Sequence, residues 1–374
     1  MGKDVIRRFD LTLDKSNAVY FEGQTINGTI NLTLNEPLEA RNITVKVLGQ
    51  GFVKITSRRR RNHRQSRRYR AEEIYVNQTF NVWGNGTKSQ IPERENVFQF
   101  SCQLPRGIPS SFEGTIGYVR YTCKCVIDRP WRFDISCKTL FTVNSFVDLN
   151  MQPVIREPVS VQATKFTGCL CWRSGPLMAK VQLKRTGYVP GESIHINAEI
   201  NNLTRKRITH TKAILVMNVA YIVRSQRRGQ SQEISEVVQD GIYPGQTFFW
   251  NSVPLPVPSV PPTRLVGCSI IDITYNIKFI VAISGCSSNL KKSIPITIGT
   301  IPLVDNFDRF VPASQNSPYR PSAPFPEYPD LPPPSYEECV LGVADGREED
   351  DNEHVYGKLT YTPSYAFYPP LGKQ

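Results

Sequence analysis

The chain has 374 residues, 40% of them hydrophobic, which suffices for two domains and excludes a fibrous or wholly disordered protein. The net charge is +12, but residues 300–374 carry 12 acidic and 5 basic residues, a net of −7, so the other residues carry a net of +19. This basic body predicts either contact with anions, such as anionic lipid or phosphorylated protein, or a charge that serves only solubility.

Alternating apolar and polar residues predict β-strands throughout the first 300 residues. In residues 25–34, Ile26, Ile30, Leu32 and Leu34 share one face, which is typical of a sandwich strand with one wet face. Helical spacing of apolar residues is hard to find before residue 300, and Pro, Gly and Asn recur about every ten residues, as in a β-sandwich. Further strands are predicted at 9–13, 73–76, 97–100, 119–127 and 133–143.

A basic run at residues 58–70 contains eight arginines and predicts a solvated hairpin loop. Three interpretations stay open: a nucleic-acid patch, a site for phosphate-bearing lipid or phosphoprotein, or a plain soluble loop. An anion site would use Arg58, Arg59, Arg60 and Arg61. Apart from Tyr69, no aromatic residues interleave the basic ones as base stacking requires, so we expect no nucleic-acid partner.

The second half of the chain repeats the first. The pattern Tyr-x-x-Gly-(Gln/Glu)-x-Ile occurs at 20–26 and again at 188–194, and each copy leads into an alternating strand. A proline-punctuated loop followed by a strong strand closes each half, ending at 119–127 and 271–279. Two β-sandwiches of related design are therefore predicted, and the boundaries that we assign are 5–148 and 165–300.

The nine cysteines are expected to be thiols, because we expect an intracellular protein without a secretory signal or a membrane-spanning segment. Cys123/Cys125 and Cys169/Cys171 are spaced C-x-C, whereas structural zinc usually uses C-x-x-C, so no metal is predicted. The four histidines fit no catalytic motif, and no phosphate or dinucleotide loop is present. We therefore expect neither an enzyme nor a bound cofactor.

Residues 301–374 hold 13 of the 29 prolines and an acidic cluster, and they predict a disordered tail. Within them, Pro333, Pro334 and Tyr336 form the pattern P-P-x-Y, whose polyproline II segment is the kind of ligand that WW domains bind. The alternative is that the prolines act only as a spacer. A later stretch, Thr362-Pro363-Ser364-Tyr365, lacks the first proline, so a single WW-binding motif is predicted.

The tandem sandwiches, the two Tyr-x-x-Gly-(Gln/Glu)-x-Ile stretches, the start Phe9-x-Leu11-x-Leu13-Asp14 and the Cys169–Pro176 turn together resemble the arrestin fold. The added P-P-x-Y motif is similar to that of the arrestin-domain-containing proteins, or alpha-arrestins. The resemblance implies an all-β protein with two immunoglobulin-like sandwiches.

The resemblance also implies an adaptor that brings WW-containing HECT-type ubiquitin ligases to membrane receptors or transporters, for ubiquitination, endocytosis and endosomal sorting. It implies a cytoplasmic protein recruited to the plasma membrane and endosomes. The alternative that the residues leave open is a ligase-independent trafficking module, which binds anionic lipid or coat proteins through its basic surface and associates peripherally with membranes.

Overall fold

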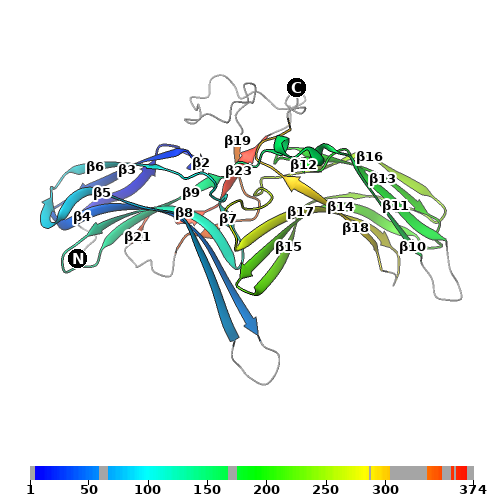
Figure 1. Ribbon diagram of the computed structural model, residues 1–374, viewed down its shortest axis with the longest axis horizontal. Helices are drawn as coiled ribbons and strands as arrows, with labels where there is room; N and C mark the ends of the chain where they lie inside the picture. The colour runs from blue at the N-terminus through cyan, green and yellow to red at the C-terminus, as the bar shows by residue number, and fades with distance from the viewer. Residues whose placement is uncertain are drawn as a thin grey trace.

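A computed structural model describes residues 5–58, 66–166, 175–285, 288–303, 335–347, 355–357 and 359–368. Two β-sandwiches lie end to end in an arched molecule, and a long hairpin projects from its middle (Figure 1). The predicted tandem of β-sandwiches is thus confirmed. Within the described ranges, no helix combines the length and the apolarity that crossing a bilayer demands.

The N-terminal sandwich packs a three-stranded sheet against a larger one. The first sheet has the order β1–β3–β6, with strands Ile6–Leu13, Thr25–Leu34 and Glu95–Gln103. The second has the order β2–β9–β8–β4–β5, with strands Val19–Phe21, Ile135–Asn144, Gly117–Asp128, Leu38–Arg58 and Ser66–Ile91. Two short strands extend it, because β7 (Phe112–Glu113) pairs with β8 and β21 (Val355–Tyr356) pairs with β9.

The C-terminal sandwich repeats this plan. One sheet has the order β10–β11–β13–β16, with strands Val159–Phe166, Pro176–Leu183, Ser193–Asn202 and Thr247–Pro256. The other has the order β12–β18–β17–β14–β15, with strands Gly187–Tyr188, Leu290–Ile298, Ile271–Ile283, Ile208–Val223 and Gln226–Gln239. Two short 3-10 turns, η1 (Leu149–Met151) and η2 (Pro153–Arg156), connect the sandwiches.

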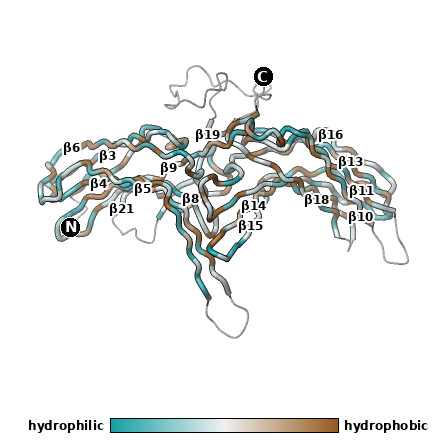
Figure 2. Tube along the Cα trace, in the orientation of Figure 1, coloured by the Kyte–Doolittle hydropathy of each residue, from teal (hydrophilic) through white to brown (hydrophobic). Residues whose placement is uncertain are grey.

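The apolar faces predicted from alternation form the core. Ile26, Ile30 and Leu32 on β3 are fully buried, and hydrophobic residues recur along the strands of both sandwiches (Figure 2). Gly28 interrupts this apolar row for a steric reason, because a Cβ there would lie 2.1 Å from the Phe100 ring. The large residue on β6 therefore fills the space that a side chain on β3 would otherwise take.

The repeated Tyr-x-x-Gly-(Gln/Glu) pattern builds the same turn twice. Gly23 and Gly191 both have a positive φ, at 79° and 96°, which glycine adopts without strain. The residue after each glycine is buried, and its side chain accepts a hydrogen bond from the amide three residues earlier. Gln24 Oε1 accepts from the Phe21 amide, and Glu192 Oε2 accepts from the Val189 amide, each at 3.0 Å. The repetition in sequence thus reflects one turn geometry used in both sandwiches.

The structure departs from the sequence-based boundaries in three places. β10 pairs along its whole length with β11, so the second sandwich takes in residues from Val159, earlier than the predicted 165. β9 begins at Ile135, and the residues from 133 that were assigned to this strand belong to the preceding turn. The β4–β5 ladder continues to Arg58 and resumes at Ser66, because hydrogen bonding between two strands needs no apolar side chains.

The expected disorder of residues 301–374 does not hold where the structure describes them. Two pairs of short strands form there: β19 (Ser335–Glu338) with β23 (Ser364–Phe367), and β20 (Ala344–Asp345) with β22 (Thr360–Tyr361). The physical reason is tertiary, because these residues bury aromatic side chains against the two sandwiches rather than against one another.

Candidate functional site

The projecting β4–β5 hairpin carries the basic run of the sequence. Arg58 ends β4 opposite Ser66, whereas Arg59, Arg60 and Arg61 lie outside the described residues. In the stem, Lys54 faces Arg70 and Thr56 faces Arg68 across the ladder, so these side chains share one face. Val53 and Ile55, which alternate with them, are buried. The stem therefore has an apolar face turned inward and a cationic face turned outward.

Described segments 335–347, 355–357 and 359–368, called the tail clasp below, return to the two sandwiches: β19 and β23 lie at their junction (Figure 1), whereas β21 pairs with Ser136 and Cys137 near the start of β9. Tyr336, the tyrosine of the P-P-x-Y motif, lies in β19 opposite Ala366 of β23. Pro333 and Pro334 lie outside the described residues. The predicted ligase-binding motif therefore leads directly into a strand that is paired at the centre of the molecule.

Buried tyrosines attach the tail clasp to the N-terminal sandwich. The Tyr365 hydroxyl donates a 2.8 Å hydrogen bond to the carbonyl of Ser111, and the Tyr361 hydroxyl donates to the carbonyl of Phe141 at 3.2 Å. The buried Lys138 on β9 donates from Nζ to the carbonyl of Gly346 at 3.1 Å. Each bond satisfies a polar group that has lost contact with water, which would be costly to leave unpaired.

The same segments also bind the C-terminal sandwich. Ser259 Oγ donates to the carbonyl of Glu337 at 2.7 Å, and the Val340 amide donates to the carbonyl of Ser259. Near the chain end, the Tyr368 amide donates to the carbonyl of Pro190, and the Tyr368 hydroxyl donates to the carbonyl of Thr300. The tail clasp thus joins both sandwiches at once.

Tyr365 belongs to the second, incomplete tyrosine motif. Its side chain is only 1% exposed, so in this arrangement no partner can reach it. The prediction that residues 362–365 do not form a second WW ligand is consistent with this burial, although the sequence argument rested only on the missing proline. In the structure, Tyr365 of this stretch packs against the N-terminal sandwich.

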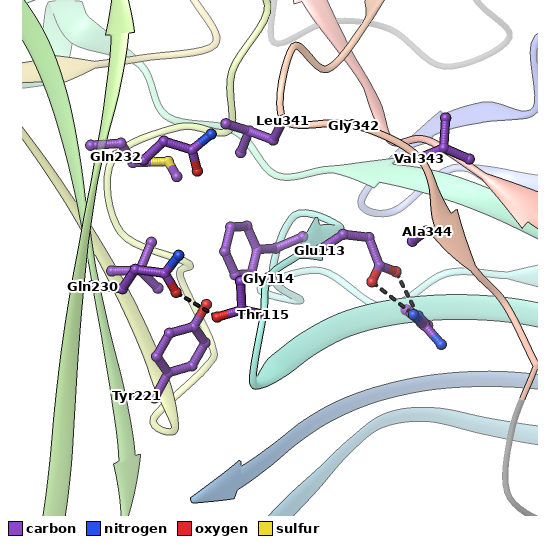
Figure 3. Close-up of a pocket in the computed structure, with 14 residues that line it drawn as sticks. Glu113, Gly114, Thr115, Tyr221, Gln230, Gln232, Leu341, Gly342, Val343 and Ala344 are labelled. Atoms are coloured by element: carbon purple, nitrogen blue, oxygen red, sulfur yellow. Dashed lines mark hydrogen bonds and ion pairs between the residues drawn. The ribbon is translucent and has the colours of Figure 1, made fainter.

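A cavity of about 280 Å³ lies where the sandwiches and the tail clasp meet (Figure 3). β7 and β8 line it from one side, β14 and β15 from another, and residues 341–344 of the tail clasp complete it. Thr115 Oγ1 donates to Gln230 Oε1 at 2.5 Å across the domain boundary. The cavity therefore lies at the interface between the domains. Its shape depends on the relative placement of the two sandwiches and the tail clasp.

A buried ion pair forms one wall of this cavity. Arg120 donates from Nε and Nη2 to the two carboxylate oxygens of Glu113, at 2.5 and 2.8 Å, and its guanidinium also lies 4.0 Å from the Tyr118 ring centre. Burial raises the pKa of the Glu113 carboxyl, and the bonds from Arg120 act in the opposite direction. Since the pair satisfies itself, this wall offers a ligand little unpaired charge.

Most cysteines in the described ranges are buried in the protein interior and are not accessible as reactive thiols. Cys123, Cys125 and Cys137 are fully or almost fully buried in the N-terminal sandwich. Burial raises the pKa of the Cys102 thiol to about 11 and that of Cys339 to about 12. No cluster of three metal-ligating side chains exists among the residues that the structure describes, and Cys169 and Cys171 lie outside them.

Sequence reasoning missed the residues that join the parts. Glu113 and Arg120 are seven positions apart and meet only because β7 folds back on β8. The tyrosines of the tail clasp looked like ordinary members of a proline-rich tail. A usable signal was present in residues 355–368, which hold four tyrosines and one phenylalanine in fourteen positions, more aromatic content than a disordered segment usually has.

Comparison with known protein families gives matches over both sandwiches. Residues 9–150 match the family described as arrestin (or S-antigen), N-terminal domain, and residues 173–303 match arrestin (or S-antigen), C-terminal domain. Both descriptions name arrestin domains, and neither names a catalytic family.

Three curated proteins are similar to the chain over nearly its whole length. Arrestin domain-containing protein 17 of Caenorhabditis elegans is 27% identical, with 96% of this chain and 98% of that protein aligned. Arrestin domain-containing protein 4 of Mus musculus is 29% identical over 96% of this chain and 89% of its own length. Thioredoxin-interacting protein of Pongo abelii is 25% identical, with 98% of this chain and 94% of that protein aligned.

Proposed function

The chain belongs to the arrestin-domain-containing proteins, the alpha-arrestins, and from this premise we propose that it is a non-catalytic adaptor between a ubiquitin ligase and membrane cargo. Pro333, Pro334 and Tyr336 bind a WW domain of a HECT-type ligase, and the two sandwiches bind a membrane receptor or transporter. Ubiquitination of that cargo then promotes its endocytosis and endosomal sorting, at the plasma membrane and endosomes.

The observation that carries this proposal is the single P-P-x-Y motif joined to an arrestin body. The proline pair favours polyproline II before binding, so little ordering entropy is lost when a WW groove receives it. The tail clasp adds to this, since β19 begins at Ser335 and attaches the motif to the body. A ligase bound there would be held beside both sandwiches.

The test is capture of the full chain by isolated WW domains of HECT-type ligases. We expect the wild-type chain to bind and Tyr336→Ala to lose at least tenfold in affinity. The matched control is Tyr328→Ala, which removes a tyrosine from the same proline-rich stretch without touching the motif. Equal capture of wild type and Tyr336→Ala would show that the ligase does not bind this motif.

A second candidate function follows from the cationic face of the projecting hairpin. Lys54, Arg68 and Arg70 are exposed on this face of its stem, which leads to Arg58–Arg61 of the sequence. Such a cluster favours anionic lipid or an acidic coat protein, without any ligase. If neutralising Arg58–Arg61 to glutamine abolishes binding to phosphatidylserine vesicles while WW capture persists, this lipid contact is a separate activity.

A further inference from the structure

The turn between β8 and β9, residues 129–134, displays two aromatic side chains to solvent. Trp131 is 100% exposed and Phe133 is 79% exposed, the two highest values among the large hydrophobic side chains that the structure describes. Isolated exposed hydrophobic residues are ordinary on protein surfaces, but two aromatics two residues apart in one turn are not isolated.

The turn holds these side chains outward by its own hydrogen bonds. Arg129 Nε donates to the carbonyl of Phe133 at 2.9 Å, and the Arg129 amide donates to Asp134 Oδ1 at 3.3 Å. Trp131 adopts a φ of 58°, in the left-handed region that glycine or asparagine would occupy more easily. A bulky residue in a strained and fully exposed position gains nothing from folding, so an external role is the natural explanation.

The turn lies far from the basic hairpin and the cavity, and the nearest part of the tail clasp is β21, whose Val355 pairs with Ser136 at the start of β9. β8 meets the domain junction at Gly117, where it pairs with Val53, and reaches the outer end of the N-terminal sandwich at Asp128. At about 3.3 Å per residue, its eleven steps place the turn about 35 Å from the base of the basic hairpin. Figure 1 shows this hairpin leaving the middle of the molecule while β8 runs to its end.

We propose that the 129–134 turn is a membrane-docking site that inserts Trp131 and Phe133 into the headgroup region of a bilayer containing anionic phospholipid. Tryptophan is favoured at this depth because its ring is apolar while its N–H keeps a polar partner. Arg132 is exposed and has no ion pair among the described residues. The turn carries a net charge of +1, and the Arg132 guanidinium suits lipid phosphates.

The exposed area favours a bilayer over a folded protein partner. Two aromatic side chains offer about 300–500 Å², whereas a stable protein interface needs about 800 Å² from each side. Insertion into a bilayer has no such threshold, since binding strength grows with the apolar area inserted and with attraction to anionic lipid. The site does not rest on the ligase motif, and it is separate from the basic hairpin.

The experiment is co-sedimentation of the full chain with vesicles of phosphatidylcholine, alone or mixed with phosphatidylserine. Trp131→Gly combined with Phe133→Ala removes both rings, and glycine accepts the positive φ, so the turn should keep its backbone. We expect at least tenfold weaker binding to mixed vesicles. Arg132→Gln should weaken that binding by about fivefold and leave phosphatidylcholine binding unchanged.

Tryptophan fluorescence gives a second readout that a folding defect would not mimic. The chain has four tryptophans, so the signal is assigned by difference: a vesicle-induced blue shift that Trp131→Phe removes would report insertion of this turn. The matched control is Met151→Ala, which removes a side chain 76% exposed on η1 and should bind vesicles as the wild type does. Wild-type vesicle binding by the Trp131→Gly/Phe133→Ala chain, or its loss only on neutralising Arg58–Arg61, would overturn the proposal.

Discussion

Replacing Arg120 by methionine should destabilise the folded chain by about 3 kcal/mol at neutral pH. The side chains of Arg120 and Glu113 are 10% and 11% exposed and make two hydrogen bonds, so the change leaves a buried carboxylate without its cation. Opposite charges about 4 Å apart attract by about 4 kcal/mol at an effective dielectric constant of 20, and breaking a buried pair usually costs about 3–5 kcal/mol. Because the adjoining cavity is wide enough for water, the carboxylate can be partly hydrated, and we expect a cost near the lower end of this range.

The loss should shrink as the pH falls. Burial raises the pKa of Glu113, and removing Arg120 removes the influence that lowers it, so the pKa rises further. A carboxyl whose folded pKa is raised takes up a proton on folding, and the resulting stability is present below the unfolded pKa and lost as the pH rises through the folded pKa. The variant should therefore approach the wild type as the pH falls from neutral toward the unfolded carboxyl pKa of about 4.3.

Urea unfolding of the full chain, followed by tryptophan fluorescence, measures both effects. Adding Glu113→Gln to Arg120→Met should restore all but about 1 kcal/mol, the remainder being the lost contact between Arg120 and the Tyr118 ring. A loss of the same size with and without Glu113→Gln, or one independent of pH, would refute the assignment to an uncompensated carboxylate.

Three further predictions concern the tail clasp and the thiols. Tyr365→Phe should cost about 1–2 kcal/mol in tail-clasp opening, seen as faster hydrogen exchange in β19 and β23, because the carbonyl of Ser111 loses its donor; unchanged exchange would contradict this. Gly191→Ala should release the chain end in limited proteolysis, since its Cβ would lie 2.2 Å from the Tyr368 carbonyl oxygen, whereas Gly245→Ala, with φ of 78° but open space, should cost only about 1–2 kcal/mol of backbone strain. Iodoacetamide at neutral pH should leave Cys102 and Cys339 unmodified in the folded chain, because their raised pKa values keep them as thiols, and mass spectrometry that found rapid alkylation of either would contradict their burial.

Local sequence patterns are sufficient to predict the strands and the duplication of the sandwich. The apolar face of β3 follows from alternation alone, since each side chain there depends only on which face its position occupies. The repeated turn was visible because Gly23 and Gly191 need the same rare backbone conformation, which few other residues supply. Features of this kind are encoded within a few residues of one another.

The site was predicted less well because its contacts are long-range. Tyr365 and Ser111 are 254 positions apart, and no local pattern indicates that a tyrosine after a proline-rich stretch will find a buried carbonyl. For the same reason, Phe133 was assigned to a strand: its apolar character fits β9, but the turn that precedes Ile135 leaves it exposed. Composition identified the tail as proline-rich, but it could not detect a surface elsewhere that orders part of it.

The tail clasp changes how a ligase bound at Tyr336 would reach its substrate. A free arm would let the ligase sample a wide volume, but here the proline-rich stretch lies between two attached points. Leu303 is buried before it, and Cys339 is buried just after it. A ligase on this motif would stand next to Ser259, within a few residues of the β19 contact. The lysines it modifies would then be selected mainly by how the cargo is oriented on the sandwiches, and only secondarily by the length of the tail.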